Sequence, residues 1–189
     1  MVTAELDGVK SVEEFHEEIC KIQKKAHGDR YCEHHSVIQK MIKDHDCKSY
    51  KEFGTHQGAS AAAAMLAMPN KIQLVDTDFT KYRKYLKPLA ESYCKENNID
   101  LKIYETSSAS ISSLGDPCDL LFIDSLHKAY HLEAELELHK NSVRKYILFH
   151  DVNNTRGFPE VIHKFCNQND WKVIERSDSR EGYMLIKKI

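Results

Sequence analysis

The sequence predicts an α/β fold: a doubly wound, seven-stranded, mostly parallel sheet that ends in an antiparallel hairpin and is preceded by two helices. Three observations predict it. Short apolar runs recur roughly every 20 to 30 residues through the middle of the chain, which is the spacing of β-α-β units. Two further runs near the C-terminus are only about ten residues apart, too close for a crossover helix. The first 48 residues instead carry apolar positions at helical intervals.

Two helices are expected within these first residues. Ser11 and Glu14 form a capping box, so the first helix is expected to begin there. Its apolar stripe consists of Val12, Phe15, Ile19 and Ile22. A second helix is expected over residues 33–43, where the apolar positions are Val37, Ile38, Met41 and Ile42.

Seven apolar runs are the expected strands: residues 50–53, 72–75, 101–104, 120–123, 146–149, 171–174 and 183–186. The central runs are apolar on both faces, as in parallel strands that helices cover on both sides. Strong helix formers over residues 60–68 predict a helix that ends before Pro69. Further helices are expected from Thr80 and from residues 157–161.

The composition indicates one soluble globular domain. The chain has 189 residues, of which 41% are hydrophobic and 30% are charged. Its net charge of −2 gives no general attraction to nucleic acid or to an anionic membrane. No apolar run is long enough to span a bilayer, and residues 1–10 lack the pattern of a signal peptide. We therefore expect a single cytoplasmic domain over residues 1–189, in which residues 1–48 form a helical cover on a core of residues 49–189.

The six cysteines are scattered and include no Cys-x-x-Cys pair. Their spacing indicates neither a disulfide framework nor a zinc site, so free thiols in a reducing compartment are expected. Most of the eleven histidines are expected to be ordinary surface residues. The lysine-rich residues 81–87 are expected to form a solvated helix face rather than a nucleic-acid contact.

The strongest local motif is the glycine turn, which we define as residues 52–60 (EFGTHQGAS). It lies between an expected strand and an expected helix, at the sheet edge where open α/β folds bind ligands. Gly54 and Gly58 remove side chains where a ligand can approach the backbone. The third glycine of a dinucleotide fingerprint and the lysine of a P-loop are missing, which favours a ligand without phosphates. A purely structural tight turn is the alternative.

Asp76 ends the second expected strand, about 20 residues beyond the glycine turn. A carboxylate at this place can accept hydrogen bonds from ribose hydroxyls, and it can equally serve only as a helix cap. Asp78 is expected to cap the helix that begins near Thr80.

Together these segments resemble the class I S-adenosylmethionine-dependent methyltransferases, whose fold is Rossmann-like. The most similar branch contains the small O-methyltransferases of the catechol and caffeoyl-coenzyme A type and their sugar-modifying relatives. The resemblance covers residues 48–189 and rests on the glycine turn and on the ends of the later strands. These ends read Val75-Asp76, Glu105-Thr106-Ser107-Ser108-Ala109, Phe122-Ile123-Asp124-Ser125-Leu126-His127 and Phe149-His150-Asp151, followed by Gly157-Phe158-Pro159-Glu160-Val161.

The resemblance implies S-adenosylmethionine as the cofactor and suggests which residues contact it. The methionine part would lie against the glycine turn, at Glu52, Gly54, Thr55, Gly58 and Ser60. Asp76 would hold the ribose, and Ser107 or Ser108 would lie beside the adenine. Asp124 would lie beside the sulfonium and the methyl acceptor.

The candidate catalytic residues are Asp124, His127 and His150, which follow central strands and are expected to converge at the edge of the sheet. Methyl transfer to a hydroxyl needs in-line alignment and loss of the hydroxyl proton. His127 or His150 could take that proton, because imidazole titrates near neutral pH.

A divalent metal ion is a second route to the same chemistry. Asp124 and Asp151 offer oxygen ligands suited to Mg²⁺, with Asn153 or Asn154 as a third ligand, and the ion would lower the pKa of the acceptor hydroxyl. The chain has Val152 where metal-dependent relatives have Asn. Three alternatives for removal of the acceptor proton therefore remain open: a histidine base, a metal ion, or neither.

The expected function is S-adenosylmethionine-dependent O-methylation of a hydroxyl on a small molecule or sugar. Two rivals remain open: an N-methyltransferase or other enzyme that uses S-adenosylmethionine, and a non-catalytic cofactor-binding or interaction protein of the same fold. The expected partner is a small-molecule or sugar acceptor, and neither a membrane nor nucleic acid. Whether the chain forms a homo-oligomer is left open.

Overall fold

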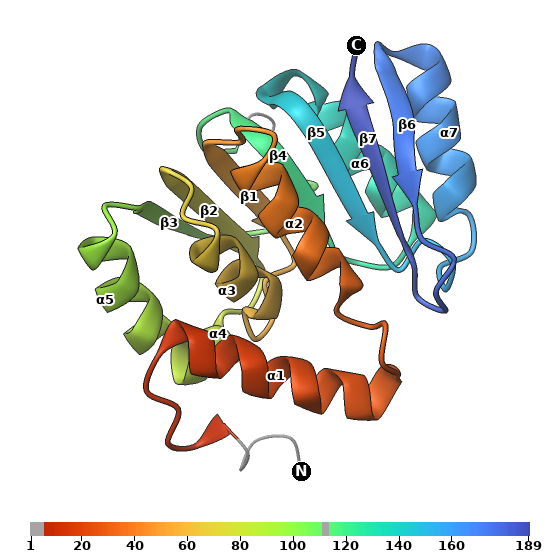
Figure 1. Ribbon diagram of the computed structural model, residues 1–189. Coiled ribbons are helices and arrows are strands. Elements are labelled where there is room, and N and C mark those ends of the chain that lie inside the picture. Colours follow the sequence, from red (N-terminus) through yellow and green to blue (C-terminus); the bar gives the residue numbers. More distant parts are fainter. Residues whose placement is uncertain (1–5, 111–113) are drawn as a thin grey trace.

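The seven expected strands form a single sheet in the order β3-β2-β1-β4-β5-β7-β6 (Figure 1). The structure is a computed structural model that describes residues 6–110 and 114–189. The strands are β1 (Ser49–Phe53), β2 (Lys71–Asp76), β3 (Asp100–Glu105), β4 (Cys118–Ile123), β5 (Val143–His150), β6 (Trp171–Arg176) and β7 (Tyr183–Lys188). The helices are α1 (Val12–His27), α2 (Glu33–Lys43), α3 (Ala59–Leu66), α4 (Thr80–Tyr85), α5 (Lys87–Glu96), α6 (Ala129–His139) and α7 (Phe158–Gln168), with the short 3₁₀ helix η2 (Lys140–Ser142).

The strand order places a switch point between β1 and β4. The chain moves outward from β1 to β2 and β3, then returns to add β4 on the other side of β1, and all these neighbours are parallel. β7 is antiparallel to both β5 and β6, which confirms the expected C-terminal hairpin. The carboxyl ends of the parallel strands therefore meet at one edge, and a crevice for a ligand is expected where β1 and β4 diverge.

The two N-terminal helices are present as expected. Ser11 Oγ accepts a hydrogen bond from the Glu14 amide at 3.2 Å, and Glu14 Oε2 accepts one from the Lys10 amide at 2.8 Å, so the capping box is complete. Both helices pack on α3 and extend over the face of the sheet that α3 and α5 also cover (Figure 1). Residues 1–5 of the predicted cover lie outside the described residues.

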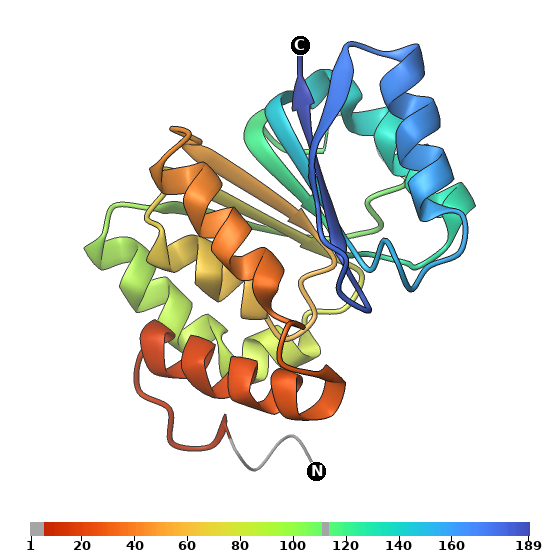
Figure 2. The ribbon, with the colours of Figure 1, turned by 45° about the vertical axis from the view of Figure 1, so that its right-hand side comes forward.

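The remaining helices cover both faces of the sheet. Side chains of α1 to α5 pack on one face, around Tyr50, Leu74 and Phe122. Side chains of α6 and α7 pack on the other face, around Phe53 and Phe149 (Figure 2). Both faces of the central strands are therefore buried, as their continuous apolar runs predict. In the described part of the chain, no helix is both long and apolar enough to cross a membrane.

One helix differs in extent from the expectation, and the helix expected from Thr80 is short. α3 ends at Leu66, before the expected end at Met68, which adopts a positive φ of 57°. The helix that begins at Thr80 stops at Tyr85, and α5 starts at Lys87 with Pro88 in its first turn. Proline fits the first turn of a helix because it lacks the amide hydrogen, and it interrupts a longer helix for the same reason. Asp78 Oδ1 accepts a hydrogen bond from the Thr80 amide at 2.8 Å, so its predicted capping role is confirmed.

Candidate functional site

The glycine turn brings the ends of β1 and β4 into direct contact. Gly54 has a φ of +89°, and a Cβ atom at this position would lie 2.1 Å from the carbonyl oxygen of Asp124. Only glycine fits this approach, since the neighbouring atom is backbone and cannot move aside. Gly58, in the left-handed region, precedes the first turn of α3. The turn thus lies against the loop that carries Asp124.

Buried polar atoms without partners lie beside the turn. Glu52 is fully buried, and the Tyr50 hydroxyl donates a 2.5 Å hydrogen bond to its Oε2. Glu52 Oε1 and the hydroxyl of Thr55 have no hydrogen-bond partner among the described residues. Burial raises the pKa of Glu52 to about 7, although its hydrogen bonds act in the opposite direction. Buried polar groups in native proteins are nearly always paired, so these atoms point to a polar ligand.

A cavity of about 690 Å³ opens at the carboxyl edge of the sheet. This volume lies within the range of small-molecule and cofactor sites. Its walls come from the ends of β1, β2, β3, β4 and β5 and include Gly54, Asp76, Thr106, Ser107, Ser108, Asp124, His127 and Asp151. A smaller space of about 70 Å³ shares Gly54 and Asp124 with this cavity and is also lined by Thr55, Ser60, His34 and His150. The structure thus brings most of the expected site residues around two adjoining spaces.

Asp76 lies on the wall of the cavity at the end of β2. Its Oδ2 accepts a hydrogen bond from the His56 amide at 2.7 Å, and its Oδ1 accepts one from the Asp78 amide at 3.1 Å. These bonds fix the orientation of the carboxylate, while each oxygen retains capacity for a further donor.

The far end of the cavity is lined by Ser107 and Ser108. Behind them lies Glu135 of α6, which is buried and accepts hydrogen bonds from the hydroxyls of Ser108 and Ser125. Its Oε2 has no hydrogen-bond partner among the described residues. His131 Nε2 lies 3.3 Å from the other oxygen. Glu135 was not among the residues that the sequence predicted for the site. The observation that could have indicated it is a carboxylate between Leu132 and Leu136, on the apolar face of a helix.

Two carboxylates and two imidazoles converge around Asp124, which lines both spaces. His127 Nε2 lies 3.2 Å from Asp124 Oδ1 and 3.2 Å from Asp151 Oδ2. His150 Nδ1 lies 3.4 Å from Asp124 Oδ1 and 3.8 Å from Asp151 Oδ2. We call these four residues the acid–histidine cluster. Asp124, His127 and Asp151 present ligand atoms close enough together to bind one metal ion.

The charges within this cluster shift the pKa values of its members. Burial disfavours the charged form of Asp124, but His150 and His127 outweigh burial and lower the pKa of Asp124 far below its usual range. The hydrogen bond to Asp124 raises the pKa of His127. Burial lowers the pKa of His150, but the charge of Asp124 outweighs it and the net pKa is raised. Burial raises the pKa of Asp151. The cluster therefore stabilises a protonated imidazole beside Asp124.

Asn153 does not join the cluster. Its amide nitrogen donates to the carbonyl oxygens of Ser177 and Ser179, at 3.0 and 2.7 Å, and its Oδ1 accepts from Arg176 at 2.8 Å. These bonds hold Asn153 against the turn between β6 and β7. Asn153, one of the two asparagines considered as a third ligand, is therefore held away from Asp124 and Asp151, and His127 is the residue that lies beside them.

The N-terminal segment also contributes to the site, at residues that the sequence did not indicate. Tyr31 lines both spaces, and its ring packs edge-on against His150 at 5.4 Å between centroids. The His34 ring lies 4.0 Å from that of His150 and stacks on Phe122. Burial lowers the pKa of His34 well below its ordinary value, so this imidazole is neutral. The segment between α1 and α2, together with the first turn of α2, thus covers the acid–histidine cluster.

Comparison with solved structures gives the same fold. An O-methyltransferase from Bacillus cereus in complex with SAH is 14% identical, with a TM-score of 0.61 and 100% of both chains covered. The SAH-bound methyltransferase PaMTH1 from Podospora anserina is 14% identical, with a TM-score of 0.62, and the match covers 100% of this chain and 92% of that one. A putative O-methyltransferase from Klebsiella pneumoniae is 15% identical, with a TM-score of 0.61 and coverage of 99% and 93%. No curated protein sequence matches the chain.

A family comparison covers the part of the chain that builds the site. Residues 51–152 match a family described as a methyltransferase domain, and this segment runs from β1 through the acid–histidine cluster. It is more than half of the chain and includes the glycine turn and Asp76. The expected fold and enzyme class are thereby confirmed. The chain belongs to this methyltransferase-domain family.

Proposed function

We propose that this methyltransferase uses S-adenosylmethionine to methylate a hydroxyl group on a small molecule or sugar. The observation that carries the proposal is the acid–histidine cluster, three of whose members line the cavity together with Gly54 and Asp76. Two O-methyltransferases with the same fold support the choice of oxygen as the methylated atom. SAH in two of the neighbours supports the choice of cofactor.

The residues present fit this cofactor. Glu52 and Thr55 provide buried polar atoms that have no partner among the described residues, and burial raises the pKa of Glu52. The ammonium group of the methionine part would supply a cation near the glycine turn. Asp76 would accept hydrogen bonds from the ribose hydroxyls, and Ser107 and Ser108, braced by Glu135, would border the adenine. When bound, the cofactor supplies an electrophilic methyl group on a sulfonium.

A divalent cation also fits the cluster, with Asp124, His127 and Asp151 as ligands. Carboxylate oxygens suit Mg²⁺ and Mn²⁺, and the imidazole also admits a softer ion such as Zn²⁺. Such an ion would lower the pKa of an acceptor hydroxyl and orient it. Asn153 is left out of this proposal because its side chain is already hydrogen-bonded elsewhere.

The imidazoles can remove the acceptor proton without a metal ion. His127 is half-exposed on the cavity wall, whereas His150 is buried deeper. Each has a ring nitrogen within 3.4 Å of Asp124. A carboxylate at this distance stabilises the imidazolium that forms when the ring accepts a proton, as the acid does in hydrolase triads. The catalytic residues we propose are therefore Asp124, His127 and His150, with Tyr31 and His34 covering them from outside.

We also propose that residues 1–48 act as the cover of one domain and confine the acceptor. Tyr31 and His34 face the cluster from this segment, so they are placed to contact an acceptor molecule. A cavity of about 690 Å³ suits a small acceptor better than a polymer.

Calorimetric titration with S-adenosylmethionine and S-adenosylhomocysteine, with and without Mg²⁺, tests the proposal first. We expect micromolar binding of both. Methyl transfer from labelled cofactor to a panel of catechols, other phenols and sugars then tests the acceptor class. Failure of a folded protein to bind either ligand contradicts the proposal. Binding with no transfer to hydroxyl acceptors, but with transfer to amines, favours the N-methyltransferase alternative. Binding with no turnover of any acceptor favours a non-catalytic protein.

A further inference from the structure

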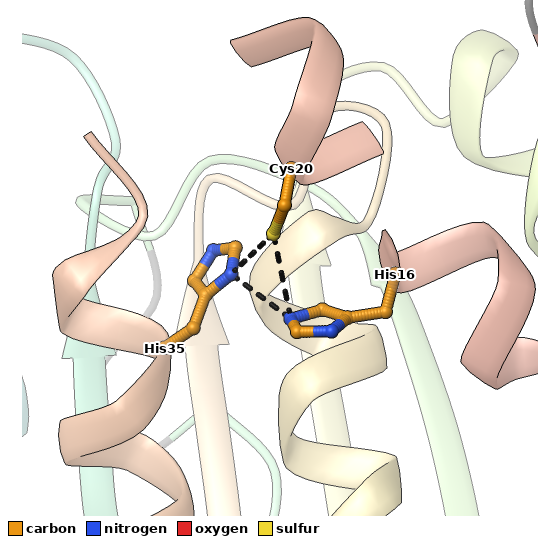
Figure 3. Close-up of side chains that lie close together, drawn as sticks. All are labelled: His16, Cys20 and His35. Carbon is orange, nitrogen blue, oxygen red and sulfur yellow. Dashed lines mark hydrogen bonds between the residues drawn. The ribbon is translucent and has the colours of Figure 1, made fainter. Parts of the chain in front are cut away.

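A second group of potential metal ligands lies outside the cavity, between α1 and α2. His16 and Cys20 are four residues apart on α1, so they share one face of that helix, and His35 comes from the first turn of α2. Figure 3 shows the three side chains pointing toward one another. His16 Nε2 lies 3.1 Å from His35 Nδ1 and 3.7 Å from Cys20 Sγ, and Cys20 Sγ lies 3.3 Å from His35 Nδ1.

These distances match three corners of a zinc coordination tetrahedron. With Zn–N near 2.05 Å and Zn–S near 2.3 Å, tetrahedral angles place two nitrogens about 3.3 Å apart and a nitrogen and a sulfur about 3.5 Å apart. Each of the three observed distances lies within a few tenths of an ångström of these values. Imidazole nitrogen and thiolate sulfur are also the ligand types that zinc prefers in structural sites.

A fourth ligand is available beside the three. Cys32 is the N-cap residue of α2, three residues before His35. Its thiol contacts Cys20 and donates a hydrogen bond to Gln23 Oε1 at 3.3 Å. A rotation of this side chain would exchange the bond to Gln23 for a bond to a metal ion. The ligand pattern is then His-x₃-Cys from α1 and Cys-x₂-His from the start of α2, with the cysteine at its N-cap.

We propose that His16, Cys20, Cys32 and His35 bind one zinc ion that joins α1 to α2. Histidine and cysteine also form blue-copper centres, but their additional ligand is a weak methionine, glutamine or carbonyl, whereas a second thiol is available here. All four ligands come from the protein, so the site is structural. It is independent of methyl transfer, and its ligands differ from those of the acid–histidine cluster.

The position of the site links it to the catalytic cavity. The His35 ring packs edge-on against His34 at 4.4 Å between centroids, and His34 lies 4.0 Å from His150. A metal ion on His35 would therefore hold α2 where Tyr31 and His34 cover the acid–histidine cluster. The two helices otherwise meet chiefly through α3, on which both pack.

Cobalt titration of the full chain, after removal of bound metal with a chelator, tests this proposal. We expect one Co²⁺ per chain with the near-ultraviolet thiolate-to-cobalt absorption and the strong visible bands of a tetrahedral site, both bleached by one equivalent of Zn²⁺. Cys20→Ser and His16→Ala should each weaken binding more than about 100-fold, beyond the loss typical of a residue outside the coordination sphere. Cys32→Ser should weaken it and reduce the thiolate absorption.

Two controls separate this site from the rest of the chain. Cys166→Ser alters a half-buried thiol on α7, on the other side of the sheet, and should leave the absorption unchanged. Asp151→Asn removes a ligand of the acid–histidine cluster, which contains no sulfur and cannot produce the thiolate band. His16 is only partly buried, so His16→Ala remains informative if the Cys20 variant fails to fold.

Three results would overturn the assignment. One is the absence of a thiolate-to-cobalt band in the folded wild-type chain. The second is a band that survives unchanged in the folded Cys20→Ser and His16→Ala variants. The third is a Cys20–Cys32 disulfide, found by mass spectrometry in protein that binds no metal under reducing conditions either. Failure of the proposed methyl transfer would leave the cobalt result unaffected.

Discussion

Replacement of Asp76 by alanine tests the cofactor site most directly. If the carboxylate accepts hydrogen bonds from the ribose, Asp76→Ala removes a charged acceptor, and such a bond contributes about 1.5–3 kcal/mol. The dissociation constant for S-adenosylhomocysteine should therefore rise about 10- to 150-fold. The mutation also frees the amides of His56 and Asp78, which Asp76 now binds. Both hydrogen bonds are exposed to solvent, so water can replace the carboxylate and most of the loss should appear in binding rather than in folding.

Asp78→Ala is the matched control, because it removes a carboxylate only two residues away. Asp78 caps α4 through the Thr80 amide at 2.8 Å and does not line the cavity. Its loss should lower the free energy of unfolding by about 1 kcal/mol and leave the dissociation constant unchanged. Calorimetric titration with S-adenosylhomocysteine measures binding without turnover, and urea denaturation measures stability. Unchanged affinity in Asp76→Ala, or an equal loss of affinity in both variants, would refute the ribose assignment.

Three further predictions concern the same edge of the sheet. Gly54→Ala should lower the free energy of unfolding, measured by urea denaturation, by roughly 2–4 kcal/mol. The new Cβ would meet a backbone carbonyl oxygen, and the residue has a positive φ. A decrease of less than about 0.5 kcal/mol would contradict this prediction. Glu52 has a folded-state pKa raised from 4.5 to about 7, so its stabilising contribution is complete below pH 4.5 and is lost as the pH rises through 7. Glu52→Gln should remove this loss of stability, of up to about 3 kcal/mol, and an identical pH profile for both proteins would exclude an uncompensated buried carboxyl. Asp151→Ala should abolish any stimulation by Mg²⁺ while it changes the affinity for S-adenosylhomocysteine less than about twofold, and an activity still stimulated by the ion would exclude Asp151 as a ligand.

The sheet could be predicted from the sequence because its signals are local. Each strand is a short apolar run, and the glycine turn places residues with special backbone needs at a strand end. Asp124 and His150 could be assigned to one edge for the same reason, since parallel strands align their carboxyl ends. Asn153 shows the limit of this reasoning. It is only three residues beyond β5, yet the turn between β6 and β7 supplies the carbonyl oxygens of Ser177 and Ser179, which hold its side chain.

Residues from the N-terminal helices could not be placed in the same way. Tyr31 and His34 reach the acid–histidine cluster because α2 packs on α3. Local sequence patterns predict that a helix forms, but they do not predict which other helix it packs against. Glu135 was more accessible to prediction. A carboxylate between two core leucines is costly to bury unless it is hydrogen-bonded, so its presence there points to polar partners, which are Ser108 and Ser125.

The proposed zinc site consists of residues whose sequence spacing is unspecific and which only the fold brings together. Neither half is specific alone, because His16 and Cys20 are separated like any two residues on one helix face, and Cys32 and His35 are separated like any N-cap residue and a residue of the first helical turn. Because the sequence has no Cys-x-x-Cys pair, it predicts ordinary free thiols. Packing of α1 and α2 on α3 turns the two helix faces toward each other and brings three ligand atoms within 3.7 Å. Because His34 lies between this group and His150, the metal site would determine how firmly the cover holds over the catalytic residues. Loss of zinc should accordingly disturb the acceptor side of the cavity before it disturbs Asp76 on the cofactor side.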